Sequence, residues 1–211
     1  MNARADETLA RIGAIGVLPV VVIDDAADAV PLGHALAAGG IPCAEITLRT
    51  AAGLAAIRAL AGIEEFLVGA GTVLAVGQLD ESVDAGARFI VSPGFDGDLV
   101  ARAADRGVTP LPGVATATDV MSALGAGLSV LKFFPAAQLG GAATISALAG
   151  PFPDVLFVPS GGVAIDTAAD YADSPVLALS TSWVAPRSLI AEHRFDEITA
   201  RAREFRAAIG R

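Results

Sequence analysis

The sequence predicts an α/β fold: a single-domain (β/α)8 TIM barrel with a short N-terminal helix, spanning residues 1–211. Short runs of β-branched and other apolar residues alternate with alanine-rich stretches of helical length, which is typical of βα units that build a parallel sheet. The alternation occurs eight times, the number of units in a closed barrel. With 54% hydrophobic residues, the chain has enough apolar material for one large core. An open, doubly wound sheet is the alternative architecture.

Eight apolar runs are expected to form the strands, because each is short and is bounded by glycine, proline or polar residues. They cover residues 17–23, 43–48, 66–71, 89–92, 108–111, 128–134, 155–159 and 176–179. Pro110 lacks the amide proton that a strand ladder needs, so we expect the fifth strand to be irregular there. Small residues follow several strands and leave room for a ligand beside their C-terminal ends, where barrel enzymes bind substrates.

The alanine-rich stretches between these strands are expected to be helices. They begin near Asp25, Thr50, Ala75, Asp98, Thr116, Leu139, Ile165 and Phe195. The last helix has the clearest amphipathic pattern, since its apolar residues recur at helical spacing and its charged residues lie elsewhere. Its apolar stripe consists of Phe195, Ile198, Ala202, Phe205 and Ile209.

Charge and composition exclude several classes of function. A formal net charge of -9 argues against binding to nucleic acid or to an anionic membrane surface, because both require clustered positive charge. No apolar run approaches the roughly 20 residues of a membrane-spanning helix, and residues 1–12 lack the apolar centre of a signal peptide. Cys43 is the single cysteine, so no intrachain disulfide can form and a cytoplasmic location is expected.

Lys132 is the only lysine among 14 basic residues, and it lies within an apolar run, residues 128–135. An amine that loses its hydration in an apolar strand is shifted towards its neutral, nucleophilic form. Such a lysine can attack a carbonyl to form a Schiff base. Alternatively, Lys132 extends its head to water or pairs with a buried carboxylate for structural reasons.

The second predicted strand places Glu45, Thr47 and Arg49 on one face, because side chains alternate along a strand. Polar groups that point into a barrel are costly unless they serve each other or a ligand. Glu45 is a candidate general acid or base, and Arg49 can hold a carboxylate through two hydrogen bonds. A structural ion pair between Glu45 and Arg49 is the alternative.

Two loops near the C-terminus combine hydroxyl groups with small residues. They contain Ser160-Gly161-Gly162 after the seventh strand and Ser180-Thr181-Ser182-Trp183 after the eighth. In many barrels the loops after these two strands bind phosphate through backbone N–H groups. Simple helix capping is the alternative for either loop alone. No metal site is expected, because neither His34 nor His193 has the spacing of a metal-binding motif.

Several motifs in order along the chain resemble those of the 2-keto-3-deoxy-6-phosphogluconate aldolase family, which includes 4-hydroxy-2-oxoglutarate and 6-phosphogalactonate aldolases. The motifs are Gly40-Ile41-Pro42, Glu45-Ile46-Thr47-Leu48-Arg49-Thr50, Val68-Gly69-Ala70-Gly71-Thr72-Val73-Leu74, Phe89-Ile90-Val91-Ser92-Pro93-Gly94, Leu111-Pro112-Gly113-Val114-Ala115-Thr116 and Leu131-Lys132-Phe133-Phe134-Pro135-Ala136. The resemblance covers nearly the whole chain. It implies a (β/α)8 class I aldolase, usually a homotrimer, that needs no metal or organic cofactor.

The resemblance also implies roles for individual residues. Lys132 would form the iminium with the substrate ketone, and Glu45 would move protons. Arg49 and Thr72 would hold the substrate carboxylate. The remaining expected contacts are Pro93 and Phe134, which would line the pocket, and Ser160, Gly161, Gly162 and Ser182, which would bind phosphate. The implied reaction is reversible cleavage of a keto acid to pyruvate and glyceraldehyde 3-phosphate.

The chain departs from the family pattern at both phosphate loops. Ser160 stands where many members have threonine, and this change keeps a hydroxyl group. Ser180 and Thr181 replace two glycines, which adds side chains where a phosphate would otherwise meet backbone. A 4-hydroxy-2-oxoglutarate or 6-phosphogalactonate aldolase with oxaloacetate decarboxylase side activity is therefore an alternative. A cofactor-free isomerase or decarboxylase, and a non-catalytic barrel that binds a sugar acid phosphate, are further alternatives.

Overall fold

Parallel strands form the inner layer of the molecule. The computed structural model describes the backbone of residues 3–210 and the side chains of residues 7–210. The strands are β1 (Val17–Val21), β2 (Cys43–Thr47), β3 (Leu67–Gly71), β4 (Phe89–Val91), β5 (Thr109–Leu111), β6 (Gly113–Val114), β7 (Val130–Phe133), β8 (Leu156–Pro159) and β9 (Leu179–Thr181). They form a six-stranded sheet in the order β5-β4-β3-β2-β1-β9 and a three-stranded sheet in the order β6-β7-β8. The predicted α/β class with parallel strands is confirmed.

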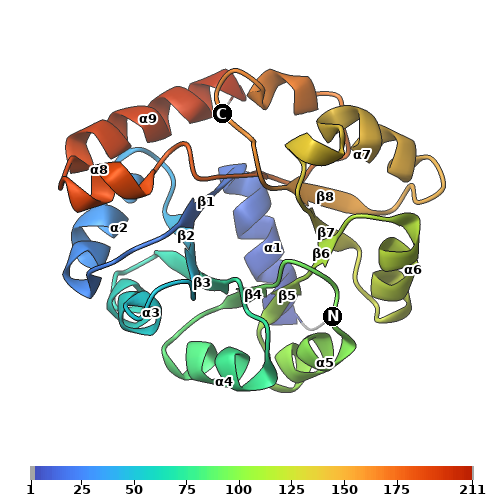
Figure 1. Cartoon of the computed structure of the whole chain (residues 1–211), viewed down its shortest axis with the longest axis horizontal. Coiled ribbons are helices and arrows are strands. Elements are labelled where there is room, and N and C mark those ends of the chain that lie inside the picture. The colour runs from blue at the N-terminus through green and yellow to red at the C-terminus, as the bar shows by residue number, and fades with distance from the viewer. Residues whose placement is uncertain (1–2, 211) are drawn as a thin grey trace.

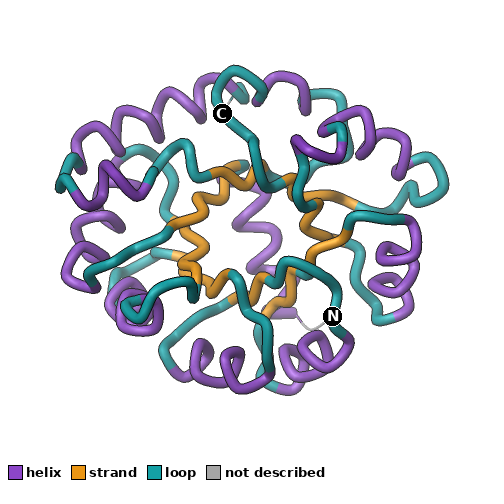
Figure 2. Tube along the Cα trace, viewed as in Figure 1, coloured by secondary structure: helices purple, strands orange, loops and turns teal. Residues whose placement is uncertain are grey.

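The two sheets curl around a common interior (Figure 2). On one side the chain runs directly from β5 to β6 through Pro112; the predicted strand 108–111 corresponds to β5, and β6 was not predicted. On the other side, isolated bridges pair Phe157 with Val176 and Ser160 with Ser180. The sheets are therefore neighbours on both sides, but their ladders do not form one continuous eight-stranded ring in the described residues.

The expected irregularity of the fifth strand lies at Pro112 and not at Pro110. Pro110 is part of β5, where it pairs with Ile90 of β4. Because β5 is the edge strand of its sheet, the missing N–H of Pro110 removes no second ladder bond. Pro112 separates β5 from β6, and its carbonyl accepts a hydrogen bond from the Lys132 amide at 2.9 Å.

Helices form the outer layer around the strands, and α1 crosses the opening that the strands surround (Figure 1). The α-helices are α1 (Ala3–Ile15), α2 (Ala29–Ala38), α3 (Gly53–Ala61), α4 (Val76–Asp84), α5 (Gly97–Asp105), α6 (Ala117–Gly125), α7 (Gly141–Ala149), α8 (Arg187–Ala191) and α9 (Phe195–Ala208). Short 3-10 helices are η1 (Ala26–Asp28), η2 (Ala137–Leu139) and η3 (Ala168–Tyr171). The expected N-terminal helix is thus present as α1.

Side-chain caps mark the starts of α5 and α6, and two expectations near the C-terminus are wrong. Thr116 caps α6 in a reciprocal capping box with Asp119, and the helix begins where it was expected. No α-helix begins near Ile165, because the Thr167 hydroxyl bonds to the N–H and C=O of Ala164 and closes a local turn that competes with a helix. The last predicted strand, 176–179, shares only Leu179 with β9.

The core fills the interior of the strands and the space between strands and helices. Phe89, Phe133 and Phe157 are fully buried, and the last two rings meet edge to face with centroids 6.3 Å apart. Along α9, Ile198 and Phe205 are also fully buried, which confirms the predicted apolar stripe. These contacts hold the strand ends that carry the candidate site.

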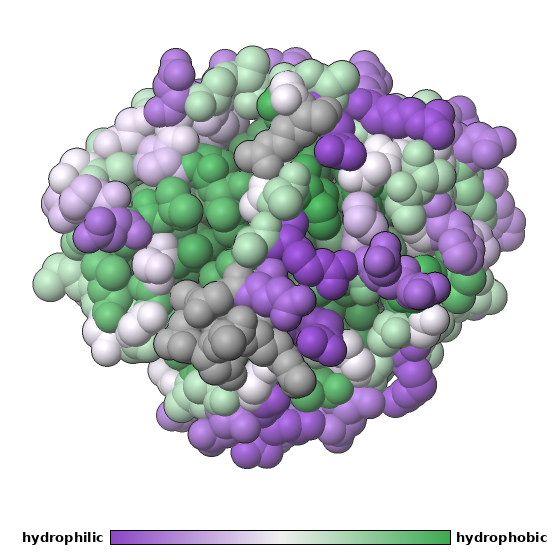
Figure 3. All heavy atoms as spheres, turned by 180° about the vertical axis from the view of Figure 1, so that it is seen from behind, coloured by the Kyte–Doolittle hydropathy of each residue, from purple (hydrophilic) through white to green (hydrophobic). Residues whose placement is uncertain are grey.

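Within residues 3–210, no helix combines the length and the apolar character needed to cross a membrane. Seen from behind, hydrophilic side chains lie near the centre of the surface and along its rim, with apolar areas between them (Figure 3).

Candidate active site

All ten residues expected at the site line one cavity of about 800 Å³. It lies at the C-terminal ends of the strands and the loops that follow them. The ten are Glu45, Arg49, Thr72, Pro93, Lys132, Phe134, Ser160, Gly161, Gly162 and Ser182. The structure therefore brings together residues that are up to 137 positions apart (182 minus 45) in the sequence.

Lys132 and Glu45 meet inside this cavity. Lys132 lies on β7 and Glu45 on β2, and the Lys132 Nζ is 3.4 Å from the Glu45 Oε1. The two side chains are only 8% and 1% exposed, so they interact away from bulk water. Glu45 Oε2 accepts no hydrogen bond from any described residue. A buried carboxylate oxygen without a donor is costly, so Glu45, which lines the cavity, is a candidate to exchange a proton with a ligand there.

The alternative pairing of Glu45 with Arg49 is not observed. The ion pair of Glu45 is with Lys132, and no ion pair of Arg49 occurs among the described residues. Arg49 follows β2, is exposed and lines the cavity. Its guanidinium is thus available to an anionic ligand. Thr47, the third residue on this face, donates its hydroxyl to the Val21 carbonyl at 3.0 Å and so serves the strand packing.

Aromatic and small residues give the cavity its shape near the amine. The Lys132 Nζ lies 5.4 Å from the centroid of the Phe134 ring, within the range of a cation–π contact. Gly71 makes room for Glu45, because a Cβ at Gly71 would lie 2.2 Å from Glu45 Oε1. The sequence showed Gly71 only as part of a motif and indicated no role for it. The strand register, which pairs Glu45 with Gly69 and Thr47 with Gly71, is the signal that could have identified it.

Thr72 has a strained backbone. Its φ angle is 58°, in the left-handed region that β-branched residues rarely adopt. The next amide, that of Val73, donates to the Val91 carbonyl at 3.1 Å and fixes the chain after the turn. Strain of this kind is held only where the surroundings enforce it, and it is common at functional sites. Thr72 lines the cavity in this conformation.

At the far end of the cavity, Ser180 and Thr181 link two loops. The Ser180 hydroxyl donates to the Ser160 hydroxyl at 3.2 Å, and the Thr181 hydroxyl donates to the Val163 carbonyl at 2.6 Å. Thr181 also accepts a hydrogen bond from the Trp183 amide at 3.0 Å. Both side chains are at most 2% exposed. The two residues that replace the family's glycines therefore bond to protein groups.

The glycines of the loop after β8 are required by their backbone conformation and their close packing. Gly161 and Gly162 have φ angles of 91° and 78°, which favour glycine. A Cβ at Gly162 would lie 2.4 Å from the Ala137 Cβ. The backbone N–H of Gly162 has no acceptor among the described residues, whereas the parallel bridge between Ser160 and Ser180 engages backbone groups beside Gly161. The Gly162 amide is thus available to an anion in the cavity.

Sequence reasoning missed two arginines that line the same cavity, Arg187 and Arg201. Arg187 opens α8 directly after the last phosphate loop, and this proximity in sequence is a signal that could have identified it. Arg201 lies on α9 among other charged residues, and no feature of the sequence distinguishes it from them.

The other candidate residues considered from the sequence lie away from the cavity. His34 is exposed, and His193 Nε2 is 3.0 Å from Asp28 Oδ1. Cys43 is buried and donates to the Val17 carbonyl at 3.3 Å, and burial raises the pKa of its thiol to about 12. Over the part of the chain that the structure describes, no three His, Cys, Asp or Glu side chains cluster as a metal site would require.

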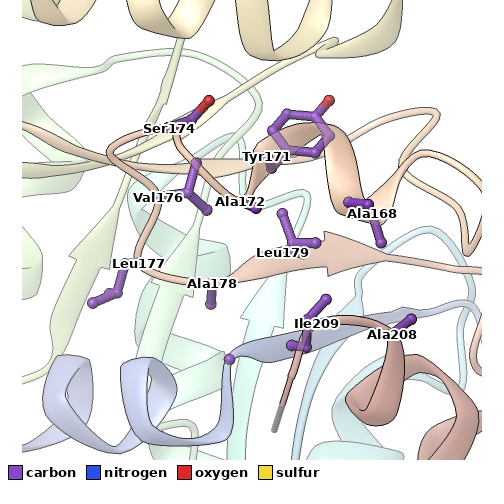
Figure 4. Close-up of a pocket in the computed structure, with 12 residues that line it drawn as sticks. Ala168, Tyr171, Ala172, Ser174, Val176, Leu177, Ala178, Leu179, Ala208 and Ile209 are labelled. Atoms are coloured by element: carbon purple, nitrogen blue, oxygen red, sulfur yellow. The ribbon is translucent and has the colours of Figure 1, made fainter.

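A second cavity of about 210 Å³ contains none of the expected site residues (Figure 4). It lies between η3, the chain entering β9 and the end of α9, and alanine and aliphatic side chains form most of its lining. Tyr171 contributes its phenol, whose pKa is raised by burial and by the nearby Asp170. The cavity at the strand C-termini is therefore the better candidate for catalysis.

Comparison with known proteins agrees with this geometry. Residues 9–201 match the family model described as "KDPG and KHG aldolase". The 2-dehydro-3-deoxy-phosphogluconate aldolase of Treponema pallidum (strain Nichols) is 45% identical over 201 residues, which cover 93% of this chain and 94% of that protein. The chain belongs to the KDPG and KHG aldolase family. It is therefore an aldolase, a carbon–carbon lyase.

This aldolase also resembles a further curated protein and two solved structures. The KHG/KDPG aldolase of Escherichia coli (strain K12) is 44% identical over 191 residues, 89% of each chain. A Zymomonas mobilis ZM4 2-keto-3-deoxy-6-phosphogluconate aldolase, solved with 3-phosphoglycerate, is 41% identical with a TM-score of 0.86, over 95% of this chain and 94% of that chain. A Legionella pneumophila KDPG aldolase, with pyruvate captured as a covalent carbinolamine, is 39% identical with a TM-score of 0.89, over 93% of this chain and 96% of that chain.

Proposed function

We propose that this aldolase cleaves 2-keto-3-deoxy-6-phosphogluconate to pyruvate and glyceraldehyde 3-phosphate through a Schiff base on Lys132. The observation that carries the proposal is the buried Lys132, 3.4 Å from Glu45 in a cavity whose rim carries Arg49. The relatives named as 2-dehydro-3-deoxy-phosphogluconate aldolases support the substrate. The Legionella structure with a pyruvate carbinolamine supports the covalent step.

The reaction follows from the chemistry of an amine and a β-hydroxy ketone. The neutral Lys132 amine adds to the C2 carbonyl of the substrate, and the resulting carbinolamine loses water to give an iminium. Removal of the C4 hydroxyl proton breaks the C3–C4 bond, and its electron pair moves into the iminium to give an enamine. Glyceraldehyde 3-phosphate leaves. Protonation of the enamine at C3 and hydrolysis of the new iminium release pyruvate and restore Lys132.

Glu45 is the residue we propose to move the protons. Its Oε1 contacts the amine and its Oε2 has no donor among the described residues, so one carboxylate can reach both the nitrogen and a ligand beside it. General acid–base catalysis by one positioned group contributes about 10²- to 10⁴-fold in rate. The Phe134 ring, 5.4 Å from the Lys132 nitrogen, would stabilise the positive charge of the iminium.

The two ends of the substrate are proposed to bind at opposite parts of the cavity. Arg49 and the Thr72 hydroxyl would hold the carboxylate, and Pro93 would line the pocket beside it. The phosphate would bind at Gly161 and Gly162, where the Gly162 N–H has no acceptor among the described residues. The hydroxyls of Ser160 and Ser182 are proposed as further phosphate contacts.

We further propose that the two curled sheets act as one closed (β/α)8 barrel in a cytoplasmic homotrimer. The continuous chain from β5 to β6 and the bridges between Phe157 and Val176 and between Ser160 and Ser180 support closure. The trimer rests on the family resemblance. The cytoplasmic location rests on the single, buried Cys43, which cannot form an intrachain disulfide.

A 4-hydroxy-2-oxoglutarate aldolase is the second candidate function. The far end of its substrate carries a carboxylate, and the donors proposed for the phosphate can bind that group as well. The Escherichia coli relative, named KHG/KDPG aldolase, also favours this reading.

The test is a comparison of kcat/KM for 2-keto-3-deoxy-6-phosphogluconate, its unphosphorylated analogue and 4-hydroxy-2-oxoglutarate, with pyruvate release measured for each. We expect the phosphorylated substrate to have the highest value, by at least about 10²-fold over the unphosphorylated analogue, because several hydrogen bonds to charge are lost. Equal values for these two would contradict the phosphate site. Pyruvate binding without turnover of any of the three would favour the non-catalytic alternative.

A further inference from the structure

Arg187 lines the cavity but has no role in the proposed reaction. It is the first residue of α8 and follows Ser182, a proposed phosphate contact, by five positions. Its side chain is 60% exposed, so the guanidinium lies where solutes can reach it. α8 was not expected from the sequence, and this helix is what holds Arg187 beside the cavity.

Asp24 fixes one edge of the Arg187 guanidinium. Arg187 Nε donates to Asp24 Oδ2 and Nη2 donates to Asp24 Oδ1, both at 2.6 Å. These hydrogen bonds hold the pKa of the Asp24 carboxyl below its usual range, so the pair stays charged near neutral pH. A guanidinium has five N–H donors in a plane, and Asp24 occupies two. Three donors, including both on Nη1, have no partner among the described residues.

Other cationic side chains of the cavity are already engaged or belong to the other end of the substrate. Arg201 bonds to Glu197 and to the Trp183 carbonyl, and its guanidinium lies 5.0 Å from the centroid of the Trp183 ring. Lys132 and Arg49 are assigned to the pyruvyl end. Arg187 is thus the cation at the far end with an unoccupied hydrogen-bonding edge in the described structure.

Several hydrogen-bond donors of the loop after β9 are already used within the protein. The Trp183 amide donates to the Thr181 hydroxyl, so this backbone N–H is not available to a ligand. The Thr181 and Ser180 hydroxyls in turn donate to Val163 and Ser160. A phosphate in this part of the cavity therefore needs a donor from elsewhere, and a guanidinium presents two parallel N–H groups that match phosphate oxygens.

We propose that Arg187, oriented by Asp24, binds the terminal phosphate of the substrate and thereby determines specificity for a phosphorylated keto acid. This inference rests on the proposed aldolase function and adds to it the residue that recognises the far end. Asp24 acts as a positioning residue, because it contacts Arg187 and is not among the residues that line the cavity.

Arg187→Gln tests the proposal, with Arg194→Gln as the matched control. Arg194 is likewise exposed and ion-paired, to Glu192 and Glu197, but it does not line the cavity. For each variant, kcat/KM is measured with 2-keto-3-deoxy-6-phosphogluconate and with its unphosphorylated analogue. For Arg187→Gln the ratio of the two values should fall about 10- to 100-fold, mainly through KM, which is the range for a lost hydrogen-bonding partner of a charged group. Arg194→Gln should leave the ratio within about twofold.

Two more variants examine how Arg187 acts. Arg187→Lys keeps the charge but not the planar pair of donors, so it should restore only part of the ratio. Asp24→Asn should lower the ratio less than Arg187→Gln does, since the guanidinium remains but is held less firmly. A higher ratio in Asp24→Asn would show that Asp24 competes with the phosphate, and would overturn its positioning role.

Failure of this inference is distinguishable from failure of the aldolase proposal. An unchanged ratio in Arg187→Gln, with full pyruvate release from the phosphorylated substrate, would overturn the role of Arg187 alone. Loss of pyruvate release from the wild-type protein with every substrate would overturn the aldolase proposal itself.

Discussion

Gly71→Ala should disable the aldolase without removing any proposed catalytic group. A Cβ at this position would lie 2.2 Å from Glu45 Oε1, whereas ordinary contacts begin at 3.4 Å, so the carboxylate must move by about 1.2 Å. Glu45 is 1% exposed and Lys132 lies 3.4 Å from it, so the displaced carboxylate cannot keep both its place and its partner. A misplacement of about 1 Å at a reacting group costs about 10²-fold in rate. Overpacking should also lower the free energy of unfolding by about 1–3 kcal/mol.

The assay measures kcat and KM by coupling pyruvate release to lactate dehydrogenase, with thermal unfolding followed in parallel by circular dichroism. Gly77→Ala is the matched control. Gly77 lies in α4, has a φ outside the left-handed region, and an added Cβ would meet nothing within 4 Å. This control should keep its kcat and gain about 0.4–1 kcal/mol in stability, because alanine loses less backbone entropy on folding than glycine does.

A double-mutant cycle decides whether Gly71 acts through Glu45. Glu45→Gln should lower kcat more than it changes substrate binding, since its role is in proton transfer. Adding Gly71→Ala to Glu45→Gln should then cost little further activity, because both changes affect the same group. A folded Gly71→Ala variant with wild-type kcat would refute the reasoning. Strictly additive losses in the cycle would show that Gly71 acts elsewhere.

Three further outcomes are expected. Lys132→Met should abolish cleavage while the variant still folds, as judged by circular dichroism; an unfolded variant would point to a structural lysine. Thr72→Val keeps the branched shape but loses the hydroxyl contact to the substrate carboxylate, so it should raise KM about 10-fold with little change in kcat. An unchanged KM would remove Thr72 from the binding site. Burial raises the pKa of the Cys43 thiol from 9.0 to about 12, so the thiol should resist alkylation at pH 8 until the protein is unfolded. Because the unfolded thiol ionises first, the stability that this burial contributes is complete below pH 9 and is lost as the pH rises towards 12, which urea melts between pH 8 and pH 11 can measure.

Local patterns in the sequence predicted much of the fold and part of the candidate site, whereas Thr72, Pro93 and Phe134 were expected there only from the family resemblance. The alternation of short apolar runs with helical stretches predicted the parallel strands, and the two-residue period of a strand placed Glu45 and Arg49 on the face that the structure directs to the cavity. The isolation of Lys132 in an apolar run identified the amine. These features depend on residues near each other in the chain, which is why the sequence alone could reveal them.

The features that were missed depend on contacts between distant segments. The break between β5 and β6 at Pro112 depends on the neighbouring strand β7, whose Lys132 amide bonds to the Pro112 carbonyl. The need for glycine at position 71 becomes visible only when the Glu45 side chain on the neighbouring strand is known to lie against it. The orientation of Arg187 depends on Asp24, which lies 163 positions earlier in the chain. The helix expected near Ile165 is a local exception, because the Thr167 hydroxyl bonds to Ala164, three residues earlier, and closes a tight turn.

Reduction of the protein with borohydride in the presence of pyruvate tests the central claim most directly. Lys132 is the only lysine of the chain, so the α-amino group is its only other primary amine. Peptide mass spectrometry after reduction should find the pyruvyl adduct on the peptide that contains Lys132, together with loss of aldolase activity in proportion to labelling. An active enzyme that forms no adduct at Lys132 under these conditions would contradict the Schiff-base mechanism.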